Sequence, residues 1–228
     1  MYVTSNLYDT VFNVKKIMYG GNSILQIMKE KRVFLFKVFL NLLVQLAITY
    51  YVMTNTFLPI PIWITALAIF VILIIIAFVP MPMYIKFFLF SIFSFLMGML
   101  LSQGIKGVDS SAIQFALIGV ACIFIAMLFA GIILLMLGIK LGYYTFMFLS
   151  FGLLFAILLS ILRLFKAFAI HINQVGLSIG MIFLFSIYII YNTQQILRRD
   201  YAGDFITASM DYYLDIINIF IRLLDLFD

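Results

Sequence analysis

The chain of 228 residues has very few of the side chains from which most catalytic and metal sites are built. It holds one cysteine, Cys122, and one histidine, His171. A single cysteine excludes an internal disulfide framework and a multi-cysteine metal site. A single histidine excludes a histidine cluster, and no Ser/His/Asp triad can be assembled. We read His171 as a solvated interfacial side chain rather than a pH sensor. We therefore expect no enzyme and no bound cofactor.

Charge is also scarce. Charged residues make up 10% of the chain and hydrophobic residues 66%, and the mean hydropathy is +1.23. A soluble domain is typically about half apolar and about a quarter charged, so the composition predicts an integral membrane protein whose main partner is the lipid bilayer. The net charge of +5 resides mainly at the ends of apolar segments, and we expect no nucleic-acid partner.

Long apolar runs are what the chain does have. A transmembrane helix needs about 20 mostly apolar residues, and prolines or glycines separate the runs that qualify. The prediction is an all-α membrane domain over residues 33–228 after an N-terminal segment, 1–32. Its seven expected helices are 33–53, 60–79, 83–101, 112–137, 143–165, 175–197 and 212–227. The last is the weakest, because 16 residues reach only about 24 Å; it either spans as a short central helix or re-enters.

Lysine and arginine in the short loops predict the orientation of the chain. One side would hold Lys15, Lys16, Lys29, Lys31, Arg32, Lys37, Lys86, Lys140, Arg198 and Arg199, and the other Lys106, Arg163 and Lys166. We expect a cytoplasmic N-terminus. The membrane would be the endoplasmic reticulum or Golgi in a eukaryotic or virus-infected cell, and the plasma membrane in a bacterium.

A polar stripe interrupts the last apolar segment. Its members are spaced by three or four residues, which puts them on one face of a helix: Asp211, Asp215, Asn218, Arg222 and Asp225. The preceding segment ends on a similar edge with Asn192, Gln195 and Arg199. We expect the two edges to face each other, since an ionised group facing lipid costs about 2.5–3.5 kcal/mol.

Different roles are expected along this stripe. Arg222 lies three residues before Asp225, which predicts a structural ion pair. Asp215 has no cation nearby on its own helix, so it needs a partner, a proton or a transiently bound calcium ion. We predict that Asp215, Asn192, Asp211 and Asn218 form an ion pathway or sensor.

Three stretches resemble the transmembrane Bax inhibitor motif family, which includes Bax inhibitor-1 and the lifeguard and Golgi anti-apoptotic proteins. They are "IYNTQQI" at Ile190–Ile196, "YYLDIINIF" at Tyr212–Phe220 and "FLFKVFLNLLVQLAITYYV" at Phe34–Val52. The resemblance implies a six-helix shell around a central seventh helix. It also implies a pH-sensitive calcium leak, suppression of cell death in eukaryotic members, and two aspartates on the last two helices that share a proton.

The chain departs from that family pattern in two places. Asn192 stands where the family has the sixth-helix aspartate, and the second helix has no charged residue to match the arginine of some members. Two like charges resist ionising together. An amide lacks that repulsion and can donate a hydrogen bond to Asp215. Our hypothesis is a weakened pH switch with an ion pathway retained.

Two functions remain open on the sequence. The first is a calcium or cation leak channel that modulates apoptosis or stress. The second is a non-conducting regulator that binds other membrane proteins, such as a membrane protease or a death-pathway partner.

Overall fold

The computed structural model describes residues 24–55, 60–164 and 174–227, apart from the side chains of 156, 157 and 160–164. His171, Lys15, Lys16 and Lys166 lie outside this part, as does the side chain of Arg163. All regular secondary structure in the described residues is helical, and these residues form no strand. This is the all-α fold that the sequence predicts. Following a helical stretch at 24–30, the helices are α2 (Arg32–Asn55), α3 (Ile62–Phe78), α4 (Met83–Gly104), α5 (Ser110–Met136), α6 (Tyr143–Leu164), α7 (Gln174–Arg198) and α8 (Phe205–Phe227).

Turn residues set the helix boundaries. Pro61 and Pro82 directly precede α3 and α4, where a missing N–H costs nothing because the first helical N–H groups have no partner within the helix. Asp109 caps α5 by accepting a hydrogen bond from the Ser111 N–H. Gly107 and Gly138 adopt positive φ values of 82° and 80° after α4 and α5, a conformation that glycine reaches without strain.

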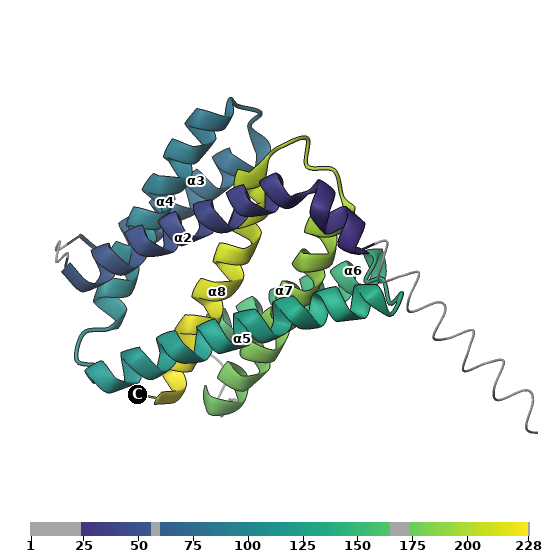
Figure 1. The fold of residues 1–228 in the computed structure, drawn as a ribbon. Helices are drawn as coiled ribbons and strands as arrows, with labels where there is room; N and C mark the ends of the chain where they lie inside the picture. Colours follow the sequence, from purple (N-terminus) through teal and green to yellow (C-terminus); the bar gives the residue numbers. More distant parts are fainter. Residues whose placement is uncertain (1–23, 56–59, 165–173, 228) are drawn as a thin grey trace, which may run out of the picture.

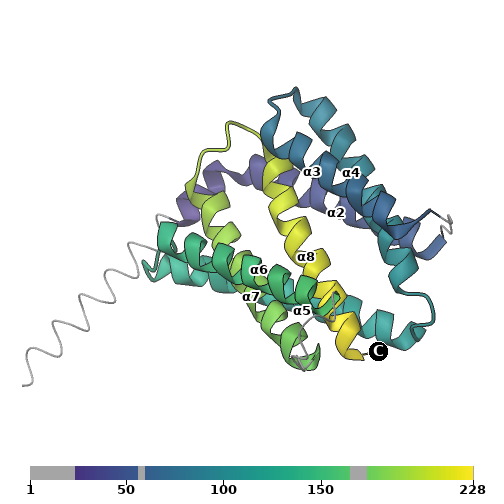
Figure 2. The same ribbon diagram turned by 180° about the vertical axis from the view of Figure 1, so that it is seen from behind.

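The helix α8 lies in the middle of the bundle (Figures 1 and 2). It packs against α2, α4, α5 and α7, while α3 packs on α4 and α6 packs on α7. Buried apolar side chains cover most of its circumference, among them Ile206, Ile219 and Phe220. The predicted shell therefore has four helices in close contact with the central one and two at the periphery.

The central helix is longer than its apolar pattern predicts. It begins at Phe205 rather than Tyr212 and has 23 residues, which corresponds to about 34 Å against a hydrocarbon core of about 30 Å. The extra turns follow from a cap, because both oxygens of Asp204 accept hydrogen bonds from Thr207, from its N–H at 3.0 Å and its hydroxyl at 2.7 Å. Length alone therefore gives no reason for α8 to re-enter.

Four described helices are long and apolar enough to cross a membrane: α2, α4, α5 and α7. Two shorter apolar helices accompany them, α3 and the 143–155 part of α6. Neighbouring helices approach each other closely where one of them carries a glycine. A Cβ on Gly98 of α4 would lie 2.7 Å from both the Thr49 carbonyl oxygen and Val52 Cβ of α2. A Cβ on Gly131 of α5 would likewise lie 2.9 Å from Thr193 Cβ of α7. Glycine allows both helix pairs to approach this closely.

Candidate functional site

The central feature of the site is a carboxylate paired with an amide. Asp215, in the middle of α8, is 4% exposed. Asn192 of α7 donates a hydrogen bond from Nδ2 to Asp215 Oδ2 at 2.8 Å. Within the described part of the chain, Asp215 has no basic group within ion-pair distance and accepts no other side-chain hydrogen bond. The carboxylate is therefore hidden from lipid but not neutralised by a cation.

The connection between α7 and α8 brings these residues together. The chain reverses direction over only six residues, 199–204, with Ala202 and Gly203 at positive φ. Asp200 stabilises the turn by accepting a hydrogen bond from the Ala202 N–H at 2.8 Å. Two antiparallel helices joined so tightly must pack side by side. The polar edges of the two helices consequently meet.

A second polar contact lies beside the first on the same helix pair. The Tyr212 hydroxyl donates to Thr193 Oγ1 at 2.8 Å, and the Thr193 hydroxyl donates to the Ile189 carbonyl at 2.7 Å. Tyr212 and Thr193 are both buried. Consecutive residues of α7, Asn192 and Thr193, thus each hold one residue of α8.

Another side of α8, which faces α2, carries a second polar network. Asn41 of α2 donates to Ser209 Oγ at 2.6 Å, and the hydroxyls of Thr49 and Tyr213 are 2.6 Å apart. Gln45 donates to Ser91 of α4 at 3.2 Å. Gln45 and Thr49 lie four residues apart on one face of α2, and both bond to neighbouring helices. Asn41, Ser209 and Tyr213 were not predicted, although Asn41 lies four residues before Gln45 on the same face of α2. That spacing was a signal that could have indicated it.

The other residues of the predicted stripe separate into distinct environments. Asp211, one turn before Asp215, is half-buried and makes no hydrogen bond with a described residue. Asn218 turns back to its own helix and donates to the Leu214 carbonyl at 2.7 Å. Arg222 Nη1 lies 3.1 Å from Asp225 Oδ2, so these two residues form an ion pair. The structure thus joins Asn192 to Asp215 by a hydrogen bond. Asp211 has no hydrogen-bond partner among the described residues, and the side chain of Asn218 bonds to the backbone of its own helix.

Basic residues secure the end of the bundle where α7 joins α8. Lys86 of α4 donates to Asp204 Oδ2 at 2.5 Å and to Thr207 Oγ1 at 2.6 Å. Burial alone would raise the pKa of Asp204, but the hydrogen bonds from Lys86 and Thr207 outweigh it and lower the pKa of this carboxyl below its ordinary value. Lys31 donates to the carbonyls of Ile196 and Arg199, which places a positive charge at the C-terminus of α7, where it is favourable. Burial lowers the pKa of Lys31, against the opposing charge of Asp200.

The donor set around Asp215 is too small for a resident metal. The described residues contain no group of three or more His, Cys, Asp or Glu side chains that could hold an ion. Calcium takes about 6–8 oxygen ligands. Asp215 and Asn192 offer three side-chain oxygens between them. Such a pair can hold a proton or contact a partly hydrated cation in passing.

The family model described as inhibitor of apoptosis-promoting Bax1 matches residues 31–228. The match covers every described helix from α2 to α8. A search of curated proteins found no match.

Proposed function

Because this chain belongs to the family of inhibitors of apoptosis-promoting Bax1, we propose that it leaks calcium or another cation across its membrane and thereby modulates cell death or stress responses. The chain is a multi-pass membrane protein with an all-helical fold. The observation that carries the proposal is the buried carboxylate of Asp215, which forms no ion pair with any described residue. No catalytic step and no bound cofactor enter into it.

The energetic argument begins with the cost of the carboxylate. An ionised side chain in the bilayer interior costs about 2.5–3.5 kcal/mol on insertion scales, whereas a hydrogen bond to a charged group returns about 1.5–3 kcal/mol. The bond from Asn192 therefore offsets most of the cost of Asp215 but leaves its charge without a counter-ion among the described residues. Thr193 and Tyr212 already hold α7 and α8 together without any charge. A buried carboxylate is therefore better suited to contact a proton or a cation than to join these helices.

A line of oxygen atoms supports a path along α8. Asp211 lies about 6 Å from Asp215 along the helix axis, and its half-buried carboxylate has no partner among the described residues. A cation that enters from the end where α7 joins α8 would meet Asp211 first and then Asp215 with Asn192. In this proposal that end faces the cytoplasm, as the distribution of Lys and Arg predicts.

The pairing also supports a weak dependence on pH. The amide of Asn192 brings no second negative charge to the contact between α7 and α8, so the strong repulsion of a paired carboxylate is absent there. The nearest like charge among the described residues is Asp211, one helical turn away. We therefore propose that the leak changes little across mildly acidic to mildly alkaline pH.

The second candidate, a non-conducting regulator of other membrane proteins, is favoured by how closed the site is. Asp215 is almost fully buried and already accepts a hydrogen bond from Asn192. In that case the polar contacts of α8 hold the bundle in one shape, and the outer helices contact a membrane protease or a death-pathway partner.

Ion flux from the purified full chain in calcium-loaded liposomes separates the two candidates. We expect the wild-type protein to leak calcium faster than protein-free liposomes do. The Asp215→Asn variant should reduce this leak several-fold. The matched control is Asp225→Asn, the same change on the same helix in a residue paired with Arg222, which should leave the leak near the wild-type value. A wild-type leak equal to that of empty liposomes would leave only the regulator, and an unchanged leak in Asp215→Asn would remove the carboxylate from the pathway.

A further inference from the structure

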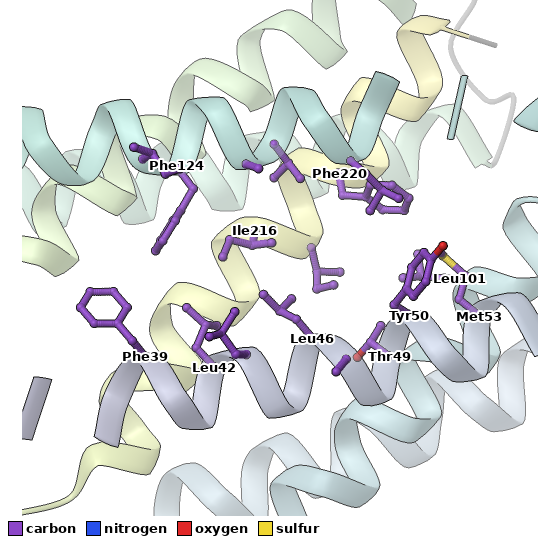
Figure 3. A pocket seen from close by; sticks show the side chains of 17 residues that line it. Phe39, Leu42, Leu46, Thr49, Tyr50, Met53, Leu101, Phe124, Ile216 and Phe220 are labelled. Carbon is purple, nitrogen blue, oxygen red and sulfur yellow. The ribbon is translucent and has the colours of Figure 1, made fainter. Parts of the chain in front are cut away.

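An apolar cavity of about 530 Å³ lies between α2 and α5, over the side of α8 that carries Ile216 and Phe220 (Figure 3). Phe39 and Leu46 of α2 line one wall and Phe124 of α5 lines the other. The central helix α8 forms the floor with Ile216 and Phe220. We call this cavity the α2–α5 groove. Its volume falls within the range of about 300–1,000 Å³ that is usual for ligand pockets.

The groove is continuous with the surface that faces the bilayer. Its lining includes Leu43, Tyr50 and Ile125, which are 65%, 50% and 55% exposed. Large apolar side chains this exposed on helices that cross a membrane are in contact with lipid chains. Whatever fills the groove therefore reaches it sideways, from the hydrocarbon region.

The lining accepts little besides hydrocarbon. Only Thr49 and Tyr50 contribute side-chain hydroxyls to it. The Thr49 hydroxyl is already engaged with Tyr213 OH and with the carbonyls of Gln45 and Ser94. Water needs about two to four polar partners to occupy a cavity, and the groove does not supply them. A polar or charged ligand would lose its hydrogen bonds there.

Shape distinguishes the apolar occupants. The α2 wall runs from Phe39 to Met53, about 21 Å along the helix and most of the bilayer hydrocarbon thickness of about 30 Å. A helix of a second protein has a diameter of about 10 Å or more, so a segment of that length would fill roughly 1,600 Å³. That is about three times the volume of the groove. A long and narrow occupant fits better.

We propose that the α2–α5 groove binds one acyl chain of a membrane lipid, which lies along α2 and rests on α8. In the groove the acyl chain fills the space between α2 and α5 that protein side chains leave empty. It contacts the side of α8 that carries Ile216 and Phe220, whereas Asp215 is held by α7 on another side of the same helix. This site is separate from the proposed ion pathway and does not depend on conduction.

Photo-crosslinking in lipid nanodiscs tests the proposal. The probe is phosphatidylcholine with a diazirine in the middle of one acyl chain, and mass spectrometry locates the adducts. Ala47→Phe and Ala121→Phe place a ring in the groove from α2 and from α5, at lining positions that are exposed. Ala66→Phe is the matched control, because Ala66 is exposed on α3 and lies outside the groove.

We expect adducts enriched on the groove residues of α2 and α5, a several-fold loss in both filling variants, and no loss in the control. Adducts spread evenly over all exposed faces, or unchanged in the filling variants, would overturn the proposal. Cross-linking between copies through Cys122, an exposed cysteine next to Ala121, detects the rival occupant. A Cys122-linked dimer that forms in the wild type and disappears in Ala47→Phe would assign the groove to a second copy of the chain. Size-exclusion profiles matching the wild type show that each variant is folded.

Discussion

Replacing Asn192 by aspartate provides a direct test of how the amide controls Asp215. The change is nearly isosteric, so the new carboxylate takes the place of the amide nitrogen that now lies 2.8 Å from Asp215 Oδ2. A favourable hydrogen bond then becomes a contact between two groups of like charge. We expect the pair to retain one proton at neutral pH and to lose it only as the pH rises.

The magnitude follows from the distance. Two unit charges 2.8 Å apart repel by about 6 kcal/mol at an effective dielectric constant of about 20. That energy corresponds to about four powers of ten in the equilibrium for removing the second proton. An effect of this size is large enough to make the state of the pair, and any leak that depends on it, strongly pH-dependent.

The assay is calcium leak from proteoliposomes, measured from mildly acidic to mildly alkaline pH. We expect a nearly flat response for the wild type, a steep one for Asn192→Asp, and loss of the steepness when Asp215→Asn is added. Asn41→Asp is the matched control, because Asn41 is buried in α2 and bonded to Ser209 rather than to Asp215. The reasoning is refuted if the wild type responds as steeply as Asn192→Asp, or if the steepness survives the loss of Asp215.

The remaining predictions concern stability. Gly98→Ala should destabilise the fold by about 1–3 kcal/mol, because its Cβ would collide with α2 at Thr49 and Val52; thermal unfolding measures this, and Gly104→Ala, with nothing within 4 Å, should be close to neutral. Tyr213→Phe should cost about 1 kcal/mol through loss of the bond to Thr49, and an unchanged melting temperature would contradict this. The pKa of Asp204 lies below its ordinary value of 3.8, so its ionised form stabilises the fold above about pH 4, and that stabilisation is lost as the pH falls through the lower folded value. Asp204→Asn should therefore flatten the acid side of the stability profile, and an equally steep acid loss in that variant would show that other carboxylates cause it.

The sequence predicts the membrane helices well because their signal is local. Each run of apolar residues between prolines and glycines is long enough to reveal itself without knowledge of its neighbours. The meeting of Asn192 with Asp215 was also within reach, because spacing fixes one face of each helix and a short connection forces the two helices together.

Other features depend on residues that are distant in sequence. The start of α8 was placed seven residues too late because Thr207, Ser209 and Asp211 interrupt the apolar pattern there. What extends the helix is the cap at Asp204, and that cap is held by Lys86 of α4. The α2–α5 groove depends on how far apart α2 and α5 lie over α8, and no local pattern encodes such a spacing.

The helix α8 is held on several sides at once, and this limits how Asp215 can become exposed. Tyr212 bonds to Thr193 of α7, and Tyr213, the next residue, bonds to Thr49 of α2. A rotation or shift of α8 that brings Asp215 toward water must break both bonds, at about 0.5–1.5 kcal/mol each. A cost of roughly 1–3 kcal/mol leaves the open arrangement populated at about 0.6–16%, so Asp215 would reach water only for a minor part of the time. An acyl chain bound in the groove, as proposed above, would add a third restraint of a different kind, because the same movement would displace it from Ile216 and Phe220. Lipid composition and the tyrosine hydroxyls would then act on the same equilibrium, although neither contacts the carboxylate.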